Sequence, residues 1–522
     1  MLSRLHSAAA TGIDAVPVEI EVDISTGLPT VVMVGLPDAA VRESRDRVKA
    51  AVTNSGYRFP NRRLTINLAP AEVTKSGPLY DLPIAIAILA ATGDVAPESV
   101  EGAYLVGELA LDGRARRVAG VLPAAIAARD AGATRMIVPA GNAREAAVVE
   151  GLAVYGVETL AEAVGVLSGG LDAEPVFVSA REILSDRGVY DVDFADVRGQ
   201  ESAKRAVTVA AAGGHNILMI GPPGSGKSMM AKRVPTILPA LSLPEAIETT
   251  KVHSVAGALA GGEALVATRP FRSPHHTTSY AGMVGGGRDP VPGEVSLAHN
   301  GVLFLDELPE FDRQTKEALR QPLEDGHVTV SRAAGRVTFP ASVTLLAAMN
   351  PCPCGYYTDP KRVCRCTPQK IHAYLSRVSG PLLDRIDIHV EVLPVQYREL
   401  SSDRAGESSE SLRELVDRAR AVQAARFGET EASGAGAGAG ATGIFTNAQM
   451  SEKQIKRFCR PRPEAASLLK QAMTELGFSA RAYTRILKVS RTIADMAGAD
   501  SIAAEHVSEA IAYRALDRGG IF

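Results

Sequence analysis

The eight residues from 221 to 228 limit the possible folds of this chain more than any other segment. They are Gly221, Pro222, Pro223, Gly224, Ser225, Gly226, Lys227 and Ser228, which fit the pattern G-x-x-x-x-G-K-[ST]. An apolar strand-like segment precedes them, and a helical pattern follows. In this context the glycines let backbone N–H groups surround a phosphate chain at a helix N-terminus. We predict an ATP site with Lys227 on the β- and γ-phosphates and Ser228 on Mg²⁺; the alternative is a Gly-Pro-rich turn.

A second segment ends in two carboxylates. Four apolar residues, Val302 to Leu305, are typical of a buried parallel strand, and Asp306 and Glu307 follow them directly. Asp306 is predicted to hold Mg²⁺, and Glu307 to orient and deprotonate the attacking water. An ordinary core strand followed by a charged turn remains the alternative, but the presence of the phosphate loop favours the catalytic interpretation.

Three more polar residues are candidates for the same reaction. Asn350 follows the apolar segment Val343 to Met349, where its amide can contact the attacking water or the γ-phosphate. Arg385 stands between Asp384 and Asp387 and can stabilise transition-state charge on the nucleotide of a neighbouring subunit. Arg481 begins a predicted helix and can reach the γ-phosphate. The alternatives are a loop asparagine, a salt-bridged structural arginine and a solvated arginine.

Four of the five cysteines fall close together in the sequence. Cys352 and Cys354 form one C-x-C pair, and Cys364 and Cys366 form another. Four thiolates can make a closed tetrahedral zinc site, although C-x-x-C is the usual spacing. Free thiols and a redox-labile pair are the alternatives.

Two segments carry candidate DNA contacts. Alternating residues on both sides of 331–335 predict a β-hairpin with Arg332 and Arg336 near its tip. A glycine-rich insertion from Pro270 to Glu294 carries Arg288. Such loops can project into the pore of a ring and contact phosphates; solvated loops are the alternative. The adjacent histidines of the insertion are poorly spaced for metal binding, and we assign them no metal role.

The composition limits the class of protein and its partners. A chain of 522 residues has room for about three domains. The net charge of −3 excludes a protein that coats DNA through overall basicity, so DNA contacts must be local. The absence of Trp and the 5% aromatic content disfavour a broad base-stacking platform. No signal peptide or membrane span is recognisable, so we expect a cytoplasmic protein.

The order of strand-like and helical segments predicts a multidomain α/β chain. Residues 1–170 mix strands such as Arg63–Leu68 with helices such as the apolar Leu82–Thr92. Residues 171–190 are predicted to be a linker. Residues 191–395 alternate strands and helices around the phosphate loop, and residues 396–522 are predicted to be all-helical. The Gly/Ala-rich run 433–443 is predicted to be a flexible loop.

These motifs, together with several short sequence segments, resemble the YifB/ComM family of magnesium-chelatase-like AAA+ ATPases along the whole chain. The segments are Val34-Gly35-Leu36-Pro37-Asp38, Arg272-Ser273-Pro274-His275-His276, Gly293-Glu294-Val295-Ser296-Leu297-Ala298-His299 and Asn350-Pro351-Cys352-Pro353-Cys354-Gly355. The resemblance implies an AAA+ core in which Asn350 is sensor 1, Arg385 the arginine finger and Arg481 sensor 2. It also implies that Gln200 flanks the adenine pocket and that the last block is a helical lid.

The resemblance extends to the first block, which is similar to a Lon-protease-like, S5-like α+β domain. Leu79 and Leu122 stand where the proteolytic serine and lysine would be, so this domain is expected to be non-proteolytic. For the whole chain the resemblance implies a hexameric ring motor that promotes branch migration of DNA in recombination or natural transformation. A magnesium-chelatase-type remodeller of a protein or metallocofactor, and a nucleotide-controlled scaffold, remain alternatives.

Overall fold

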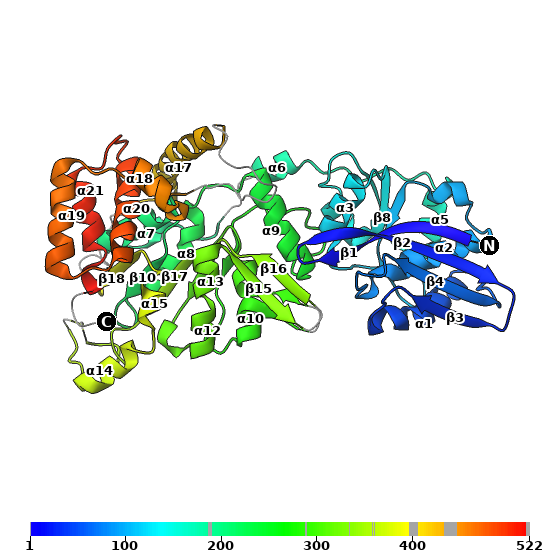
Figure 1. The fold of residues 1–522 in the computed structure, drawn as a ribbon, viewed down its shortest axis with the longest axis horizontal. Helices are drawn as coiled ribbons and strands as arrows, with labels where there is room; N and C mark the ends of the chain where they lie inside the picture. Colours follow the sequence, from blue (N-terminus) through cyan, green and yellow to red (C-terminus); the bar gives the residue numbers. More distant parts are fainter. Residues whose placement is uncertain are drawn as a thin grey trace.

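The structure is a computed structural model that describes residues 2–185, 190–287, 290–332, 335–357, 359, 361–395, 406–432 and 446–517. Its parts follow one another along the long axis of the molecule. An N-terminal α/β body lies at one end, a parallel sheet with its helices lies in the middle, and the C-terminal helices lie at the other end (Figure 1). This arrangement agrees with the predicted order of mixed, α/β and helical blocks.

The N-terminal body is built on a seven-stranded sheet in the order β3-β4-β2-β1-β5-β8-β9. Alternate residues of β4 are buried, as one half-covered face requires. Its helix α2 is apolar all round and is buried along almost its whole length, which explains why the apolar run 82–92 lies inside a domain. The strands are β1 Leu2–Thr11, β2 Asp14–Ser25, β3 Thr30–Val34, β4 Arg63–Ala69, β5 Ala103–Leu105, β8 Arg135–Pro139 and β9 Ala153–Val157, with a small pair β6 Glu108–Leu109 and β7 Ala115–Arg116. The helices are α1 Ala39–Asn54, α2 Asp81–Thr92, α3 Val121–Asp130, α4 Ala143–Ala146 and α5 Leu160–Leu167.

The central sheet has five strands in the order β11-β14-β17-β10-β18, and every neighbouring pair is parallel. Its main strands are buried, so they consist almost entirely of apolar residues. They are β10 Ile217–Ile220, β11 Phe271–Arg272, β14 Val302–Leu305, β17 Thr344–Met349 and β18 Ile388–Glu391. The carboxyl ends of parallel strands share one edge of a sheet, so the residues after β10, β14 and β17 are brought together there.

Helices and short hairpins complete the central part. They are α7 Glu201–Gly213, α8 Lys227–Ile237, α9 Leu243–Val255, α10 Tyr280–Val284, β12 Gly285–Gly286, β13 Val291–Pro292, α11 Glu294–Leu297, α12 Arg313–Ala318, α13 Arg320–Asp325, α14 Pro368–Leu375 and α15 Gly380–Leu383. The predicted hairpin is present as β15 His327–Arg332 and β16 Gly335–Pro340, paired in antiparallel register.

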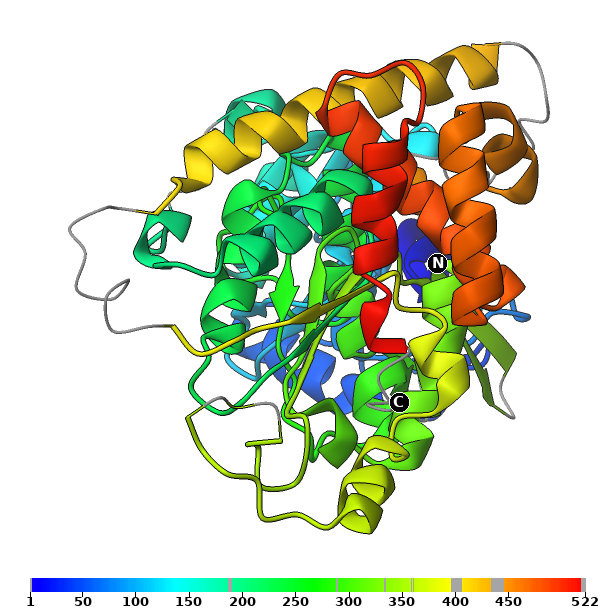
Figure 2. The same cartoon turned by 90° about the vertical axis from the view of Figure 1, so that its left-hand side faces the viewer.

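The C-terminal part is helical, as predicted. It contains α17 Ser409–Ala432, α18 Glu452–Phe458, α19 Pro463–Leu476, α20 Ala480–Met496 and α21 Ala504–Ala512. The helices α17 and α20 both pack on α7, so this part shares a hydrophobic core with the central sheet (Figure 2). The Gly/Ala-rich run 433–443 lies outside the described residues.

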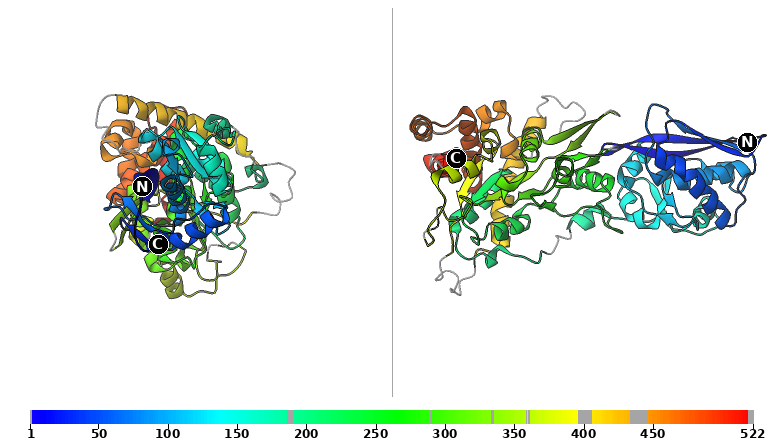
Figure 3. Two further views of the ribbon diagram at one scale, coloured as in Figure 1. Left: turned by 90° about the vertical axis from the view of Figure 1, so that its right-hand side faces the viewer. Right: turned by 90° about the horizontal axis from the view of Figure 1, so that it is seen from below.

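The N-terminal body contacts the central part at two places. The β1–β2 hairpin reaches from the N-terminal body to the central part (Figure 3). A Cβ atom on Gly12 would lie 3.5 Å from Val337 Cγ1 of β16, and Asp14 pairs with Lys251 of α9 at 2.7 Å. Deeper in the interface, the buried Glu145 carboxylate accepts a hydrogen bond from Ser254 Oγ. The N-terminal body is therefore docked against the hairpin β15–β16 as well as against α9.

The segment predicted to be a linker, 171–190, has some structure of its own. Val176 forms a β-bridge with Val154, and a short helix, α6 Ala180–Ser185, follows. Residues 186–189 lie outside the described part. Within the described residues no helix is both long and apolar enough to cross a membrane.

Candidate nucleotide site and cysteine cluster

The phosphate loop connects β10 to α8, as its sequence pattern predicts. Gly224 and Gly226 have φ values of 76° and 90°, a left-handed conformation that side chains disfavour. A Cβ atom on Gly221 would lie 2.1 Å from the carbonyl oxygen of Val392, so only glycine fits beside β18. The glycines therefore set both the turn and the close packing of the loop on the sheet.

Lys227 is the first residue of α8 and is largely buried. Its Nζ donates to the carbonyl oxygens of Gly221 at 2.7 Å and Pro222 at 3.0 Å, and it lies 3.3 Å from Asn350 Oδ1. Burial lowers the pKa of this ammonium to about 8, and the nearby Asp306 opposes the shift. The cation is thus held over the loop by neutral oxygens, and a polyphosphate would supply the negative charge that it lacks.

Ser228 and Asp306 meet across the sheet edge. Ser228 Oγ donates to Asp306 Oδ2 at 2.6 Å, although the two residues are 78 positions apart in sequence. The second carboxylate oxygen of Asp306 accepts from the N–H of Glu307 at 2.9 Å. A hydroxyl and a carboxylate side by side at the end of a phosphate loop are the oxygen ligands that Mg²⁺ prefers, so this pair fits the ion.

Glu307 has φ 52°, so its backbone is in the left-handed conformation, and its side chain is 56% exposed. Its Oε2 lies 3.5 Å from Nδ1 of His276, which comes from the insertion before β14. The rings of His275 and His276 lie 4.1 Å apart. No local sequence pattern predicts that His276 lies at this site.

Asn350 follows β17, the strand between β10 and β14. Near it on α14 lies Tyr374, whose pKa burial raises to about 12 and the backbone N–H of Asn350 slightly lowers. The structure therefore brings together Lys227, Ser228, Asp306 and Asn350, four of the residues that the sequence selected.

Gln200 is hydrogen-bonded to the phosphate loop. Its Nε2 donates to the carbonyl oxygens of Ser225 and, at 2.9 Å, of Leu393 after β18. Its Oε1 is buried and has no partner among the described residues. This amide therefore ties the phosphate loop to the segment after β18 and retains one acceptor.

Arg385 and Arg481 lie at a different place. They line a cavity with Glu324 of α13 and Lys488 of α20, and none of its described lining residues belongs to the phosphate loop. Arg385 is buried and pairs with Glu324 at 2.5 Å. Arg481 is close enough to contribute to the lowered pKa of Glu324, whose main cause is the hydrogen bond from Arg385. The structure thus places Arg481 beside Arg385, and the prediction that Arg481 reaches a γ-phosphate stays a prediction.

A buried polar network joins the sheet to α20. Asp387 pairs with Arg485 at 2.9 Å and accepts from the N–H of Asn216 at 3.1 Å. His215 Nδ1 lies 3.4 Å from the same carboxylate, and its Nε2 lies 2.7 Å from Thr492 Oγ1. Burial alone would raise the pKa of Asp387, but Arg485 and His215 outweigh it and hold the pKa below its ordinary value. No sequence pattern predicts this network, because its members come from distant segments.

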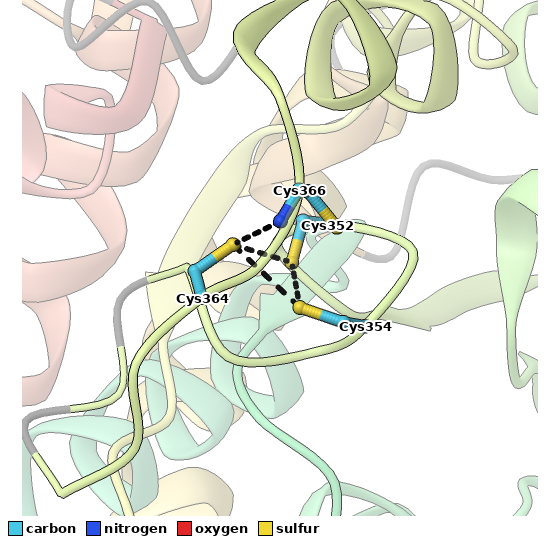
Figure 4. Close-up of side chains that lie close together, drawn as sticks. All are labelled: Cys352, Cys354, Cys364 and Cys366. Carbon is cyan, nitrogen blue, oxygen red and sulfur yellow. Dashed lines mark hydrogen bonds between the residues drawn. The ribbon is translucent and has the colours of Figure 1, made fainter.

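The four clustered cysteines converge in space as well (Figure 4). Their sulfur atoms all lie within 4.8 Å of one another, in an arrangement that could hold a metal ion. The N–H of Tyr356 is the main cause of a lowered pKa at Cys354. Cys459 lies elsewhere, buried 3.9 Å from the sulfur of Met450, as a small core residue.

The candidate DNA contacts are only partly described. Arg336 lies on β16 opposite Ser331, and its side chain is exposed. Arg288 and the side chain of Arg332 lie outside the described part of the structure. In the insertion, Arg272 donates two hydrogen bonds to the carboxylate of Glu294, at 2.7 and 2.8 Å. Its guanidinium is therefore part of an ion pair within the insertion.

The parallel sheet, the phosphate loop after β10 and the acidic pair after β14 define a P-loop core of the AAA+ type. Three family profiles match the chain. "Magnesium chelatase, subunit ChlI" matches residues 193–400, "Subunit ChlI of Mg-chelatase" matches 20–142, and "Magnesium chelatase, subunit ChlI C-terminal" matches 406–514.

Full-length relatives refine this class. The chain is 44% identical to "Competence protein ComM" of Haemophilus influenzae over 527 residues, which cover 99% of this chain and 98% of the relative. It is also 44% identical to "Uncharacterized protein YifB" of Salmonella typhimurium over 519 residues, with the same coverage. The chain is also 26% identical to "DNA replication licensing factor Mcm6" of Drosophila melanogaster over 226 residues. This weaker match covers 40% of this chain and 24% of the relative. The chain belongs to the YifB/ComM family of magnesium-chelatase-like AAA+ proteins.

Proposed function

We propose that this chain hydrolyses ATP in a ring of identical subunits and uses that reaction to move DNA, as a branch-migration helicase in recombination or natural transformation. The observation that carries the ATPase part is the convergence of two pairs at one sheet edge. Lys227 lies against Asn350, and Ser228 lies against Asp306. A lysine, a hydroxyl, a carboxylate and an amide at the end of a phosphate loop are the groups that phosphoryl transfer requires.

In this proposal each residue has a separate task. Lys227 exchanges its carbonyl partners for the β- and γ-phosphates, and Gln200 supports the loop through its hydrogen bond to Ser225. Ser228 and Asp306 would hold Mg²⁺, which neutralises charge on the phosphates. Glu307 accepts the proton of the attacking water, and Asn350 orients that water. Glu307→Gln should therefore bind ATP but hydrolyse it poorly.

The position of Arg385 and Arg481 supports a site shared between subunits. Both lie in a cavity separate from the phosphate loop of their own chain. An arginine that stabilises transition-state charge can be supplied in trans. We infer that these two arginines act on the nucleotide of the adjacent subunit, and that the assembly is a closed ring, expected to be a hexamer.

The DNA part of the proposal rests on relatives and on one exposed hairpin. The names of two relatives refer to competence and to DNA replication. The β15–β16 hairpin carries the exposed Arg336, which suits a phosphate contact. The N-terminal body packs on this hairpin at Gly12 and Val337, so it is placed to act as a scaffold for it.

For the N-terminal body itself we propose a Lon-like, S5-like fold without proteolytic activity. Leu79 and Leu122 occupy the positions at which a serine and a lysine would be needed, and Leu122 is fully buried. Two apolar side chains cannot act as a nucleophile and its base.

The proposal is tested by measuring ATP turnover under four conditions. These are no DNA, single-stranded DNA, duplex DNA and a branched junction. We expect DNA to stimulate turnover, most strongly with the branched junction, and strand exchange to depend on ATP. Unstimulated turnover would instead favour a magnesium-chelatase-type remodeller of a protein or metallocofactor. If ATP binds and changes the assembly of the subunits but is not hydrolysed, a nucleotide-controlled scaffold would be favoured.

A further inference from the structure

The four clustered sulfur atoms have the spacing of ligands around a single small ion. Cys352 Sγ lies 3.3 Å from Cys354 Sγ and 3.7 Å from Cys364 Sγ, and the last two are 3.6 Å apart. Zn–S bonds of about 2.3 Å in a tetrahedron place the sulfurs about 3.8 Å apart. A disulfide would need about 2.05 Å, and all four cysteines are free. The spacing therefore fits a tetrathiolate metal site better than a pair of disulfides.

The backbone around the sulfurs also suits bound thiolates. The N–H groups of Tyr356 and Arg365 help to lower the pKa of the Cys354 thiol, whereas burial raises the pKa of the Cys352 thiol. The N–H of Cys366 donates to Cys364 Sγ at 3.4 Å. Such donors stabilise negative charge on sulfur and fix the direction in which each ligand points. Both C-x-C pairs are thus oriented by their own loop.

We propose that Cys352, Cys354, Cys364 and Cys366 bind one Zn²⁺ as a closed structural site that fixes the loop between β17 and α14. Four protein ligands leave no open position for a substrate, so the site is structural and not catalytic. Metal binding displaces the remaining thiol protons into solvent, which makes the affinity depend on pH.

This loop joins directly to two parts of the nucleotide site. Cys352 is two residues beyond Asn350, and Cys366 precedes Thr367, whose side chain caps α14. On α14, Tyr374 lies close enough to the backbone N–H of Asn350 for that group to affect the pKa of its hydroxyl. The metal would therefore fix a loop that runs from Asn350 to the helix that carries Tyr374.

The same loop packs on the phosphate loop. Gly355 has φ 85°, and a Cβ atom there would lie 2.5 Å from Cδ of Pro223. The loop between the two cysteine pairs thus closes against the turn that binds phosphate. This positioning role rests on the proposed ATPase function, whereas zinc binding itself does not.

The first experiment measures metal in the full-length protein. We expect about one zinc per chain after purification without added metal. Four of the five cysteine thiols should not react with a thiol reagent, because they bind the metal. After exchange with Co²⁺, the protein should show the absorption of cobalt bound by four thiolates in a tetrahedron. Cys364→Ser should lower zinc occupancy by at least about tenfold, and Cys459→Ala, outside the cluster, should leave it unchanged. Absence of zinc with all thiols free, disulfides within the cluster, or iron in place of zinc would each overturn the assignment.

The second experiment tests positioning. Cys364→Ser should lower kcat for ATP by about tenfold, because Asn350 is no longer held in place. Cys364→His keeps a zinc ligand and should restore both zinc and turnover, which separates metal loss from simple misfolding. Full turnover in a folded, zinc-free Cys364→Ser protein would overturn the positioning role. Zinc in a wild-type protein without ATPase activity would leave the metal site intact and contradict the proposed function.

Discussion

His276 Nδ1 lies 3.5 Å from Glu307 Oε2, so the insertion before β14 contacts the carboxylate that we assign as the catalytic base. The two residues come from segments 31 positions apart, 276 and 307, and the histidine side chain is one-third exposed. A partner at this distance can restrict the rotamers of an exposed glutamate. The insertion can therefore influence the position of the proposed catalytic base.

We expect His276→Ala to lower kcat modestly without loss of stability. Exposed ion pairs contribute at most about 1 kcal/mol, which corresponds to roughly a fivefold change in rate. His275→Ala is the matched control, because the His275 ring lies 4.1 Å from the His276 ring, whereas the contact with Glu307 is made by His276. Steady-state ATPase kinetics distinguish the two, and equal effects from both variants would argue against a role for the pair.

Arg385→Ala should abolish turnover although ATP still binds. A transition-state arginine supplied in trans contributes about 10³-fold or more. Mixing Arg385→Ala chains with Lys227→Ala chains should restore activity, because about one quarter of the randomly formed interfaces then combine an intact loop with an intact arginine. Activity that stays at zero in mixed, assembled rings would contradict action in trans. Arg377→Ala, which removes an exposed pair with Glu310, is the charge control.

ATP affinity should decrease as the pH rises past about 8. Burial lowers the pKa of Lys227 to about 8 in the nucleotide-free chain, so its ammonium begins to lose its proton there. Binding of a polyphosphate favours the protonated form, and the apparent Kd should rise by up to about tenfold per pH unit above this value. Equilibrium titration with a fluorescent ATP analogue measures it. Lys227→Arg should bind more weakly but without this pH dependence, since guanidinium stays charged.

Asp387→Ala should destabilise the junction between the sheet and α20. Removing one partner of a buried ion pair costs about 3–5 kcal/mol, because Arg485 would remain buried without its counter-charge. Chemical denaturation measures the loss, and Asp46→Ala in an exposed pair should have little effect.

Because of Asp387, the stability of the folded chain should also depend on pH. The pKa of Asp387 in the folded chain lies below its ordinary value of 3.8. The folded state therefore binds this proton less readily than the unfolded state, so its stabilisation is present above that pH and is lost as the pH falls further. Asp387→Asn should be less stable at neutral pH and should lack this part of the acid sensitivity.

Arg332→Ala with Arg336→Ala should weaken DNA binding and leave basal turnover nearly unchanged. Each lost phosphate contact lowers the salt dependence of binding by about one unit of slope and acts on all sequences alike. Fluorescence anisotropy at several salt concentrations provides the slope, with Arg45→Ala in the N-terminal body as the control. Unchanged affinity would remove the β15–β16 hairpin from the proposed DNA path.

The sequence alone determined the local units of this protein. The strand Val302–Leu305 is buried as predicted, and the turn from Gly221 to Ser228 joins a strand to a helix. The hairpin around residues 331–335 also forms between the predicted strands. These features depend on hydrophobic periodicity and on glycine conformations, which neighbouring residues specify.

Only the tertiary structure decided which of these units meet. The sheet order places β17 between β10 and β14, and this brings Asn350 to Lys227. Packing of α20 against the sheet places Arg481 beside Arg385 and away from the phosphate loop of its own chain. The contacts of His276 and Asp387 likewise depend on segments distant in sequence. Residue spacing encodes the faces of one element, whereas the burial of those faces against other elements determines which side chains share a site.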